Sequence, residues 1–375
     1  MRKELLELLR GRCGDELKVV IYEESNAHII EGSLHEPDGY WYPIQNGVPN
    51  LLRGGLRSEQ ELFREKHNLG VLPDAQFTDH EKNQSLTNNT FSDKWRRFKN
   101  YGMLNTHKEF LFDWYCKKLG MTDINELKEF YNKKQCVLEV GPGSGFNSRF
   151  MAEQVNGTVI ALDISDAAYT TFENTNSLKN CHAVQGDLMD VPFENDFFDF
   201  IIADGVLHHT PSTKDAVFSL YNKLKPGGQF FFYVYREMGA MRKYCDDFVR
   251  EAYTKLPAED CYKACEGFTE LGRELSKLNV NVTLEKGIPE LGIPAGEHDV
   301  QRLFYYNFIK CFWNDAFDWE TNNMVNFDWY HPHNAWQHSE EEVVEWLNEL
   351  NVTDYKFNNS NPNGISVLLT KSKAV

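Results

Sequence analysis

The chain has 375 residues, of which 41% are hydrophobic and 25% charged, enough apolar material for one large or two modest globular domains. Its 56 acidic and 39 basic residues give a formal net charge of −17, which repels phosphate backbones and anionic membrane surfaces. Composition therefore disfavours nucleic acid as a partner. No apolar run approaches the ~18 residues that a membrane span needs.

Eight cysteines are present, without the paired CxxC spacing of a structural zinc site. Most are expected to be reduced core residues, and residues 1–6 begin a charged amphipathic helix instead of a signal peptide. These features predict a reducing cytoplasm and no metal. The sequence is compatible with a homo-oligomer as well as with a monomer.

The first 55 residues predict a small N-terminal module. A helix over 5–9 precedes strands over 18–22 and 27–32, and Asn46-Gly47 predicts a type I′ or similar turn. The stretch WYPIQNGVPNLL resembles the ending of a small zinc-ribbon-like module. That family's cysteine pairs are absent here, so zinc binding is not carried over. We expect a degenerate, metal-free β-module.

A mostly helical segment is expected next. The polar run over 79–89 predicts a loop. A helix is expected to start near Phe91, capped by Ser92 or Asp93, and a second helix is expected over 107–119.

The central stretch of the chain combines short apolar strands with polar strand ends. A strand over 136–140 runs into a glycine turn and then into a helix near Phe146. Free backbone N–H groups at such a helix start form a cradle for a nucleotide-like ligand, and the turn glycines permit positive φ and close backbone approach. The next strand ends in Asp163, where an α/β fold holds a ribose diol.

Two further strands, over 182–184 and 198–203, lead into Asp187 and into the sequence Asp204-Gly-Val-Leu-His-His. All these ends meet at the carboxyl edge, where open parallel sheets bind ligands. A helix over 215–224, a KPGG turn and a strand over 229–235 follow.

Five segments in this order resemble the motifs of class I S-adenosylmethionine-dependent methyltransferases. VLEVGPGSG is similar to the first motif, IALDIS to the second, QGDLMDVPF to the third, FDFIIADGVLHHT to the fourth, and LKPGGQFFFYVY to the strand and turn that follow. The form DGVLHHTP is most similar to the branch with ubiquinone and menaquinone methyltransferases. The resemblance implies an α/β, Rossmann-like seven-stranded sheet and S-adenosyl-L-methionine as cofactor.

The resemblance also implies roles for individual residues. Glu139 would orient the amino group of the methionine moiety, Asp163 would accept from the ribose hydroxyls, and Asp187 would accept from the adenine amine. Ile164 and Leu188 would flank the adenine ring. The complete cofactor-binding set implied by the motifs is Glu139, Gly141, Pro142, Gly143, Ser144, Gly145, Asp163, Ile164, Ser165, Asp187, Leu188, Asp204 and Gly205.

An insertion interrupts the family pattern after residue 237. Helices are expected over 238–254 and 259–278, and aromatic residues are dense from 304 to 336. A capping box at Ser339 precedes a helix, and two closing strands follow. The expected domains are a degenerate zinc-ribbon-like module (1–55), a helical lid or linker (56–130), the methyltransferase core (131–237), a substrate-determining insertion (238–338) and the closing helix and β-hairpin of the core (339–375).

The catalytic candidates follow from the chemistry of methyl transfer. Transfer from a sulfonium is an in-line displacement, so the protein mainly aligns donor and acceptor and excludes water. For an acceptor that loses a proton, a positioned base adds ~10²- to 10⁴-fold. His209 is the first candidate, with His208 beside it at the strand end, and Tyr330 and His338 come from the insertion.

The predicted function is methylation of a small-molecule acceptor, of an aromatic or natural-product kind. Methylation of RNA or protein is an alternative suggested by the N-terminal module, and a catalytically silent cofactor-binding partner subunit is another. A dehydrogenase is disfavoured because GPGSG lacks the dinucleotide spacing.

Overall fold

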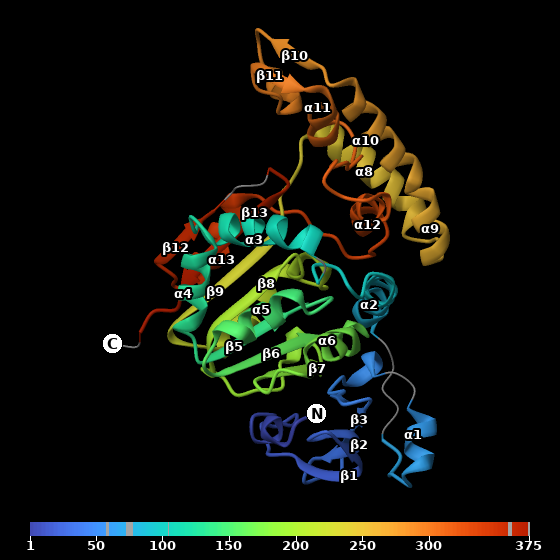
Figure 1. Ribbon diagram of the computed structural model, residues 1–375, viewed down its shortest axis with the longest axis vertical. Helices are drawn as coiled ribbons and strands as arrows, with labels where there is room; N and C mark the ends of the chain where they lie inside the picture. Colours follow the sequence, from blue (N-terminus) through green and yellow to red (C-terminus); the bar gives the residue numbers. More distant parts are fainter. Residues whose placement is uncertain (58–59, 73–77, 104, 359–361, 374–375) are drawn as a thin grey trace.

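The computed structural model describes all residues except 58–59, 73–77, 104, 359–361 and 374–375. Its centre is a seven-stranded sheet of order β12-β13-β9-β8-β5-β6-β7 (Figure 1). Six strands run parallel and β13 runs antiparallel between β9 and β12. The predicted α/β class and seven-stranded sheet are confirmed. The strands are β5 (Cys136–Val140), β6 (Thr158–Asp163), β7 (Cys181–Gln185), β8 (Phe198–Asp204), β9 (Leu224–Tyr235), β12 (Asp354–Phe357) and β13 (Gly364–Thr370).

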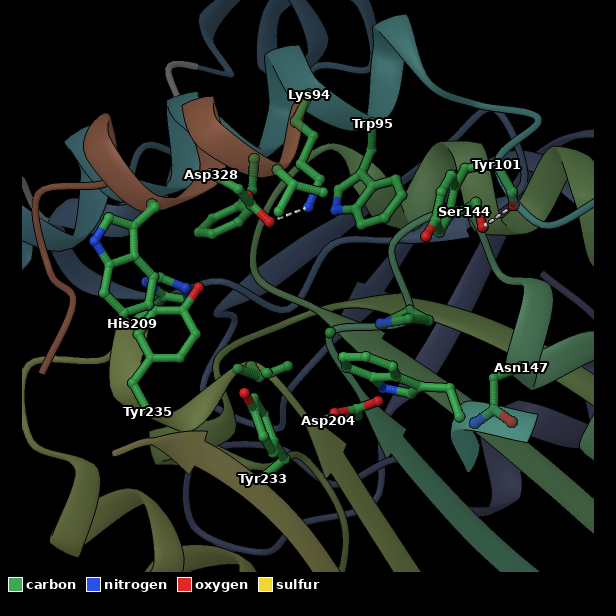
Figure 2. Close-up of a pocket in the computed structure, with 18 of the residues that line it drawn as sticks. Lys94, Trp95, Tyr101, Ser144, Asn147, Asp204, His209, Tyr233, Tyr235 and Asp328 are labelled. Atoms are coloured by element: carbon green, nitrogen blue, oxygen red, sulfur yellow. Dashed lines mark hydrogen bonds and ion pairs between the residues drawn. The ribbon is translucent and has the colours of Figure 1, made fainter. Parts of the chain in front are cut away.

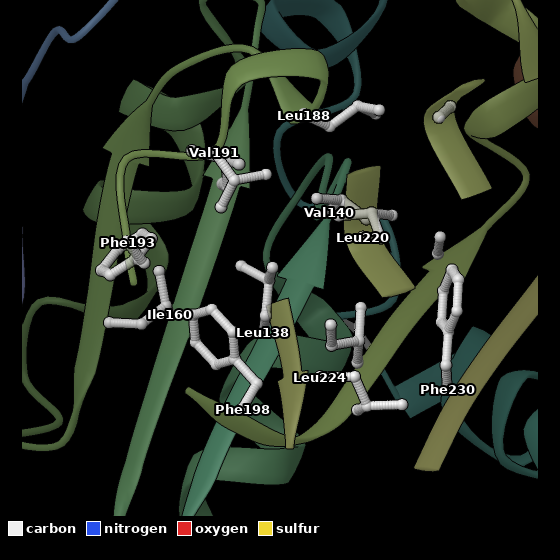
Figure 3. Close-up of a cluster of buried hydrophobic side chains, with 14 of the residues drawn as sticks. Leu138, Val140, Ile160, Leu188, Val191, Phe193, Phe198, Leu220, Leu224 and Phe230 are labelled. Atoms are coloured by element: carbon white, nitrogen blue, oxygen red, sulfur yellow. The ribbon is translucent and has the colours of Figure 1, made fainter. Parts of the chain in front are cut away.

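The central strands are apolar on both faces because helices cover both faces of the sheet. Along β5, Leu138 belongs to one hydrophobic cluster and Val137 to another, as expected for side chains that alternate across a strand. The first cluster, shown in Figure 3, also contains Phe230 of β9 and Leu220 of α7. The helices of the core are α4 (Ile124–Asn132), α5 (Phe146–Gln154), α6 (Ala167–Thr175), α7 (Thr213–Lys223) and α13 (Glu340–Glu349), with 3-10 turns at Leu188–Asp190 and Leu207–His209.

The N-terminal module is a four-stranded antiparallel sheet that shares its core with the large sheet. Its Asn46 and Gly47 have φ of 48° and 82°, as expected for the predicted type I′ or similar turn. The amide of Asn50 donates to Gln185 Oε1 at 2.8 Å, and Leu5 packs in the same cluster as Leu138. The predicted first helix is a short 3-10 helix, Lys3–Glu7, followed by β1 (Lys18–Ser25), β2 (His28–His35), β3 (Trp41–Gln45) and β4 (Val48–Pro49).

The prediction of a loop over 79–89 is wrong, because these residues form the first half of helix α2 (Asp79–Arg97). Thr78 and Glu81 make a capping box in which Glu81 N donates to Thr78 Oγ1 at 3.2 Å. The start of the helix therefore lies well before Phe91, and Ser92 and Asp93 lie inside it. The buried face of this half is polar: Asn334 N donates to Thr87 Oγ1 at 3.0 Å.

The remaining helices of the linker agree more closely with expectation. The second predicted helix is α3 (Asn105–Leu119), and a short helix α1 (Glu61–Lys66) and a 3-10 turn (Gly54–Leu56) precede α2. Because Leu119 and Cys116 of α3 pack in the second hydrophobic cluster, α3 is anchored to the sheet.

The insertion forms a separate group of helices beyond the sheet, on the side opposite the N-terminal module (Figure 1). The second helix expected there is two helices that meet at Cys265, and a small hairpin, β10 with β11, was not predicted. Its elements are α8 (Ala240–Tyr253), α9 (Ala258–Ala264), α10 (Glu266–Leu278), β10 (Asn281–Leu284), a 3-10 turn (Pro289–Leu291), β11 (Gly296–Asp299), α11 (Val300–Asn307) and α12 (Trp319–Tyr330). The loop expected before β13 lies partly outside the described residues. Within the described part of the chain, no helix is both long and apolar enough to cross a membrane.

Candidate functional site

A cavity of about 640 Å³ lies at the carboxyl ends of the parallel strands, the edge that the sequence predicts. Its floor carries four acidic residues at or next to the carboxyl ends of four neighbouring strands: Glu139, Asp163, Asp187 and Asp204. Helices α2 and α3 cover one side and the insertion covers another. Figure 2 shows Lys94 and Trp95 of α2 across the cavity from Asp204 and Tyr233.

The glycine turn after β5 has a shape that only glycine fits. Gly141, Gly143 and Gly145 have φ of 65°, 60° and 79°, in the left-handed region that side chains disfavour. A Cβ on Gly141 would lie 2.3 Å from the Val206 side chain, and one on Gly143 would lie 2.4 Å from the Trp95 indole. The turn therefore packs tightly under α2. Gly143 and Gly145 shape it without lining the cavity, whereas Gly141 does line it.

Glu139 is buried beside this turn and is held by α5. Asn147 Nδ2 donates to Glu139 Oε1 at 2.9 Å, and the Ser148 hydroxyl donates to Oε2. Burial raises the pKa of Glu139 to about 7, against these hydrogen bonds. Among the described residues, Asn147 Oδ1 is buried without a hydrogen-bond partner, and Asn147 lines the cavity. A ligand that donates hydrogen bonds would satisfy both side chains.

Two further buried carboxylates follow along the edge. Asp163 Oδ1 accepts from Ser165 N at 2.8 Å and from Ser165 Oγ at 2.7 Å. Asp187 Oδ1 accepts from Met189 N at 2.8 Å. Burial raises the pKa of each to about 6, so both gain from a ligand that donates to the ionised form. The cavity-lining side chains Ile164 and Leu188 complete this end, and Pro142, Ser144 and Gly205 also line the cavity.

Asp204 ends β8, the strand that pairs with β5, and is paired with Lys118 of α3. Lys118 Nζ lies 3.8 Å from the centroid of the Tyr233 ring. Burial lowers the pKa of Lys118, and Asp204 opposes this shift. This ion pair joins α3 to the end of β8 and closes the cavity on that side.

His209 is the one histidine candidate that lines the cavity among the described residues. Its Nδ1 lies 2.7 Å from the carbonyl oxygen of Asn334, so Nδ1 must carry the proton and Nε2 the lone pair. Burial lowers the pKa of His209 to about 4. The imidazole is therefore neutral near pH 7, the form that accepts a proton.

Three predicted catalytic residues do not line the cavity in the described structure. His208 is fully buried and stacks on Tyr235, with ring centroids 3.6 Å apart. The Tyr330 hydroxyl donates to Asp246 at 3.2 Å, and His338 Nε2 lies 2.9 Å from Thr213 Oγ1. These contacts give each residue a packing role, and their placement argues against the catalytic roles expected of them.

Sequence reasoning missed several residues of the cavity wall. These belong to α2, α3 and the insertion, outside the five motifs, and no local pattern distinguishes them from ordinary helix residues. The most polar or aromatic of them are Lys94, Trp95, Trp114, Lys118, Arg302, Tyr305, Lys310 and Asp328.

Comparison with known proteins identifies the domain. Residues 138–232 match the family model described as "Methyltransferase domain". The 2-methyl-6-phytyl-1,4-hydroquinone methyltransferase of Spinacia oleracea is 29% identical over 105 residues, 28% of this chain and 30% of that protein. The sterol 24-C-methyltransferase of Schizosaccharomyces pombe is 32% identical over 26% of this chain and 27% of that protein.

A longer match is to the tRNA U34 carboxymethyltransferase of Pseudoalteromonas atlantica, 26% identical over 230 residues, 60% of this chain and 62% of that protein. The chain thus spans less than two thirds of the length of each of these relatives. Among solved structures, "DhpI-SAH complex structure" is 14% identical, covers 77% of this chain and 98% of its own, and gives a TM-score of 0.40.

The sheet order, the glycine turn under α2 and the acidic strand ends agree with the family match. The chain therefore carries a methyltransferase domain of class I, with a Rossmann-like sheet, and residues 138–232 are its matched part.

Proposed function

We propose that the protein is an S-adenosylmethionine-dependent methyltransferase that acts on a small-molecule acceptor. The observation that carries this proposal is the two-ended cavity of about 640 Å³. One end has the glycine turn and three buried acids, and the other is walled by aromatic side chains from the insertion and from β9. Such a combination of apolar walls and few polar groups suits small molecules. Two of the relatives described above are named for a hydroquinone and a sterol.

The residues present fit S-adenosylmethionine. The unpaired Asn147 Oδ1, together with Glu139, offers acceptors to an ammonium group. Asp163 would accept from two ribose hydroxyls and Asp187 from the adenine amine, because both carboxylates are buried and retain acceptor capacity. Gly141, Pro142 and Ser144 of the turn line the cavity, so this part of the turn would face the bound ligand.

When bound, S-adenosylmethionine supplies a sulfonium methyl group for in-line displacement. The protein's part is to align the acceptor and to keep water out. Trp95, Phe91 and Trp114 line the cavity from α2 and α3, and their bulk excludes solvent. For an acceptor that loses a proton, His209 Nε2 is the proposed recipient, since its ring is neutral and lines the cavity.

The test is calorimetric binding of S-adenosylmethionine and S-adenosylhomocysteine to the purified chain and to Asp163→Ala. The variant loses charge-assisted acceptors for the diol, so we expect affinity to fall about 10- to 100-fold. Asp166→Ala is the matched control, because Asp166 lies three residues on with its side chain 54% exposed. Absence of binding to the parent, or equal binding to parent and Asp163→Ala, would contradict the cofactor assignment.

A tRNA acceptor is the second candidate, since the 230-residue match is to a protein named for tRNA. The net charge of −17 opposes it. Fluorescence anisotropy with labelled bulk tRNA at low and physiological salt tests it. Saturable binding that persists at physiological salt, with methyl transfer to the RNA, would favour tRNA over a small molecule.

A further inference from the structure

The cations that line the cavity fall into two groups. Five lysine or arginine side chains are part of its wall. In three cases a carboxylate neutralises the charge, and all three belong to α2 or α3. These pairs are Lys94 with Asp328 at 2.6 Å, Lys117 with Asp113 at 2.6 Å, and Lys118 with Asp204.

The other two cations, Arg302 and Lys310, come from α11 and the segment after it. Among the described residues, neither has a carboxylate oxygen within the 4.0 Å of an ion pair. Both flank the same ring: Arg302 Cζ lies 5.5 Å and Lys310 Nζ 5.0 Å from the centroid of Tyr305. The insertion thus brings two basic side chains without a paired carboxylate to one part of the cavity.

Lys310 is the more buried of the two, with 5% of its surface exposed. Its Nζ donates to Tyr305 Oη at 3.0 Å, the one hydrogen bond found for a group with three donors in the described structure. The Trp329 ring centroid lies 4.6 Å away. Burial, followed by the charge of Arg242, lowers the pKa of Lys310 to about 7. A buried ammonium without a counter-ion is costly, so an anion bound here would relieve that cost.

The carboxylate with the larger effect on Lys310, Asp246, is bound to other partners, and Asp328 is paired with Lys94. Asp246 Oδ2 accepts from Arg242 Nε at 2.5 Å and from Trp329 Nε1 at 2.8 Å. Its Oδ1 accepts from Tyr330 Oη at 3.2 Å and from the backbone N–H of Lys310 at 3.1 Å. Asp246 is therefore committed to Arg242 and to positioning aromatic rings.

Arg302 keeps most of its donors available. Its Nη2 donates to the carbonyl oxygen of Trp313 at 3.2 Å, and this is the one side-chain hydrogen bond that the described structure gives the guanidinium. A guanidinium has five N–H donors in a planar fork that matches a carboxylate or a phosphate. Its position on α11 is fixed at the helix start, where Asp299 caps the backbone N–H of Arg302 at 2.8 Å.

We propose that Lys310 and Arg302 form an anion subsite that holds a carboxylate or phosphate group of the acceptor, whose apolar body lies against Tyr305 and Trp329. That the bound anion is the methyl acceptor rests on the proposed function, whereas the anion site itself does not depend on it. The acids of the cofactor end lie on β5, β6 and after β7, so the cavity has opposite charge at its two ends. That asymmetry would orient an acidic acceptor with its anionic group away from the cofactor.

The test compares matched probes by calorimetry, with and without S-adenosylhomocysteine: benzoate, phenyl phosphate and the neutral benzamide. We expect at least one anionic probe to bind the parent about 10-fold or more tightly than benzamide, as for a charge-assisted contact. Which anion binds more tightly distinguishes a carboxylate from a phosphate site. Lys310→Gln and Arg302→Gln should each reduce this preference, and Lys310→Arg should retain part of it. Lys117→Gln is the control, because Lys117 lines the same cavity but is paired with Asp113 and 59% exposed.

Two results would overturn the subsite. One is a parent that binds neither anion more tightly than benzamide, including a parent that binds none of the probes. The other is a preference that survives in both Lys310→Gln and Arg302→Gln with unchanged circular dichroism. If Lys310→Gln fails to fold, two measurements still test the subsite: the affinities of the parent for the three probes, and the anion preference of Arg302→Gln at the half-buried position. A parent that prefers the anion but fails to bind S-adenosylhomocysteine would remove the cofactor assignment and leave the subsite standing.

Discussion

Replacing Gly143 with alanine should separate helix α2 from the glycine turn. Gly143 has φ of 60°, and its added Cβ would lie 2.4 Å from Trp95 Cζ2. Alanine in the left-handed region costs about 1–2 kcal/mol. Overlap with an indole that stays in place would add about 1–3 kcal/mol. The closed arrangement of α2 should therefore lose roughly 2–5 kcal/mol, a large part of ordinary domain stability.

The backbone and packing contributions can be measured separately. Gly14→Ala is the control for backbone strain, because Gly14 has φ of 81° and its added Cβ would meet no described residue within 4 Å other than its chain neighbours. In a Trp95→Ala background the overlap disappears, so Gly143→Ala should there cost only the backbone part. A double-mutant cycle of urea unfolding free energies should give a coupling of about 1–3 kcal/mol between the two positions. S-Adenosylhomocysteine affinity, measured on the same four proteins, shows whether closure of α2 supports the ligand.

The reasoning would be refuted by additive effects of the two substitutions together with a Gly143→Ala cost no larger than that of Gly14→Ala. That result would mean that Trp95 does not pack on the turn in solution, and that α2 does not close the cavity there.

Three further outcomes are expected. Since burial raises the pKa of Asp163 to about 6 and the diol donates to the ionised carboxylate, S-adenosylhomocysteine affinity should fall below pH 6, by up to about tenfold per pH unit. Calorimetry from pH 5 to 8 checks this sign, and a curve for Asp163→Asn as steep as that of the parent would contradict it. Trp329→Ala should leave cofactor affinity within a few-fold while weakening benzoate or phenyl phosphate binding; a loss of cofactor affinity in a folded variant would place the insertion in the cofactor pocket. Elemental analysis should find no stoichiometric zinc, since the N-terminal module offers one cysteine, Cys13, where a tetrahedral site needs about four ligands.

The sheet could be predicted because its signals are local. Strands such as β5 are continuous apolar runs bounded by glycine or acidic residues, and their order follows from the family motifs. The turn at Asn46 and Gly47 was equally local, since few residues tolerate positive φ at both positions. The positions of the acidic residues at one edge then follow from parallel strand direction alone.

The first half of helix α2 was missed because its buried face is polar. Sequence periodicity detects a helix by its apolar face. On the buried face of this half, Thr87 and Thr90 instead make hydrogen bonds to residues more than 240 positions away in the sequence. The capping box at Thr78 and Glu81 was the local signal that could have revealed the helix start. One of these distant partners is His331, whose Nδ1 lies 2.8 Å from Thr90 Oγ1.

The acceptor end could not be predicted, because charge compensation is a property of the folded chain. In the sequence, Lys310 and Lys118 are equivalent lysines near aromatic residues. In the fold, Lys118 meets Asp204, whereas the acid near Lys310 is occupied by Arg242. Only the long-range contacts decide which lysine keeps an unbalanced charge.

The two basic side chains of the proposed subsite belong to a protein whose formal net charge is −17. An anionic ligand is repelled by the protein as a whole, so long-range attraction cannot guide it to the cavity. Recognition must come from short-range contacts with Lys310 and Arg302, inside aromatic walls where screening by salt is weak. The same burial that makes an unpaired Lys310 unfavourable in the free protein strengthens its contact with a bound anion. A ligand that binds only the folded chain also stabilises it by mass action, so occupation of the proposed subsite and stabilisation of the insertion would occur together.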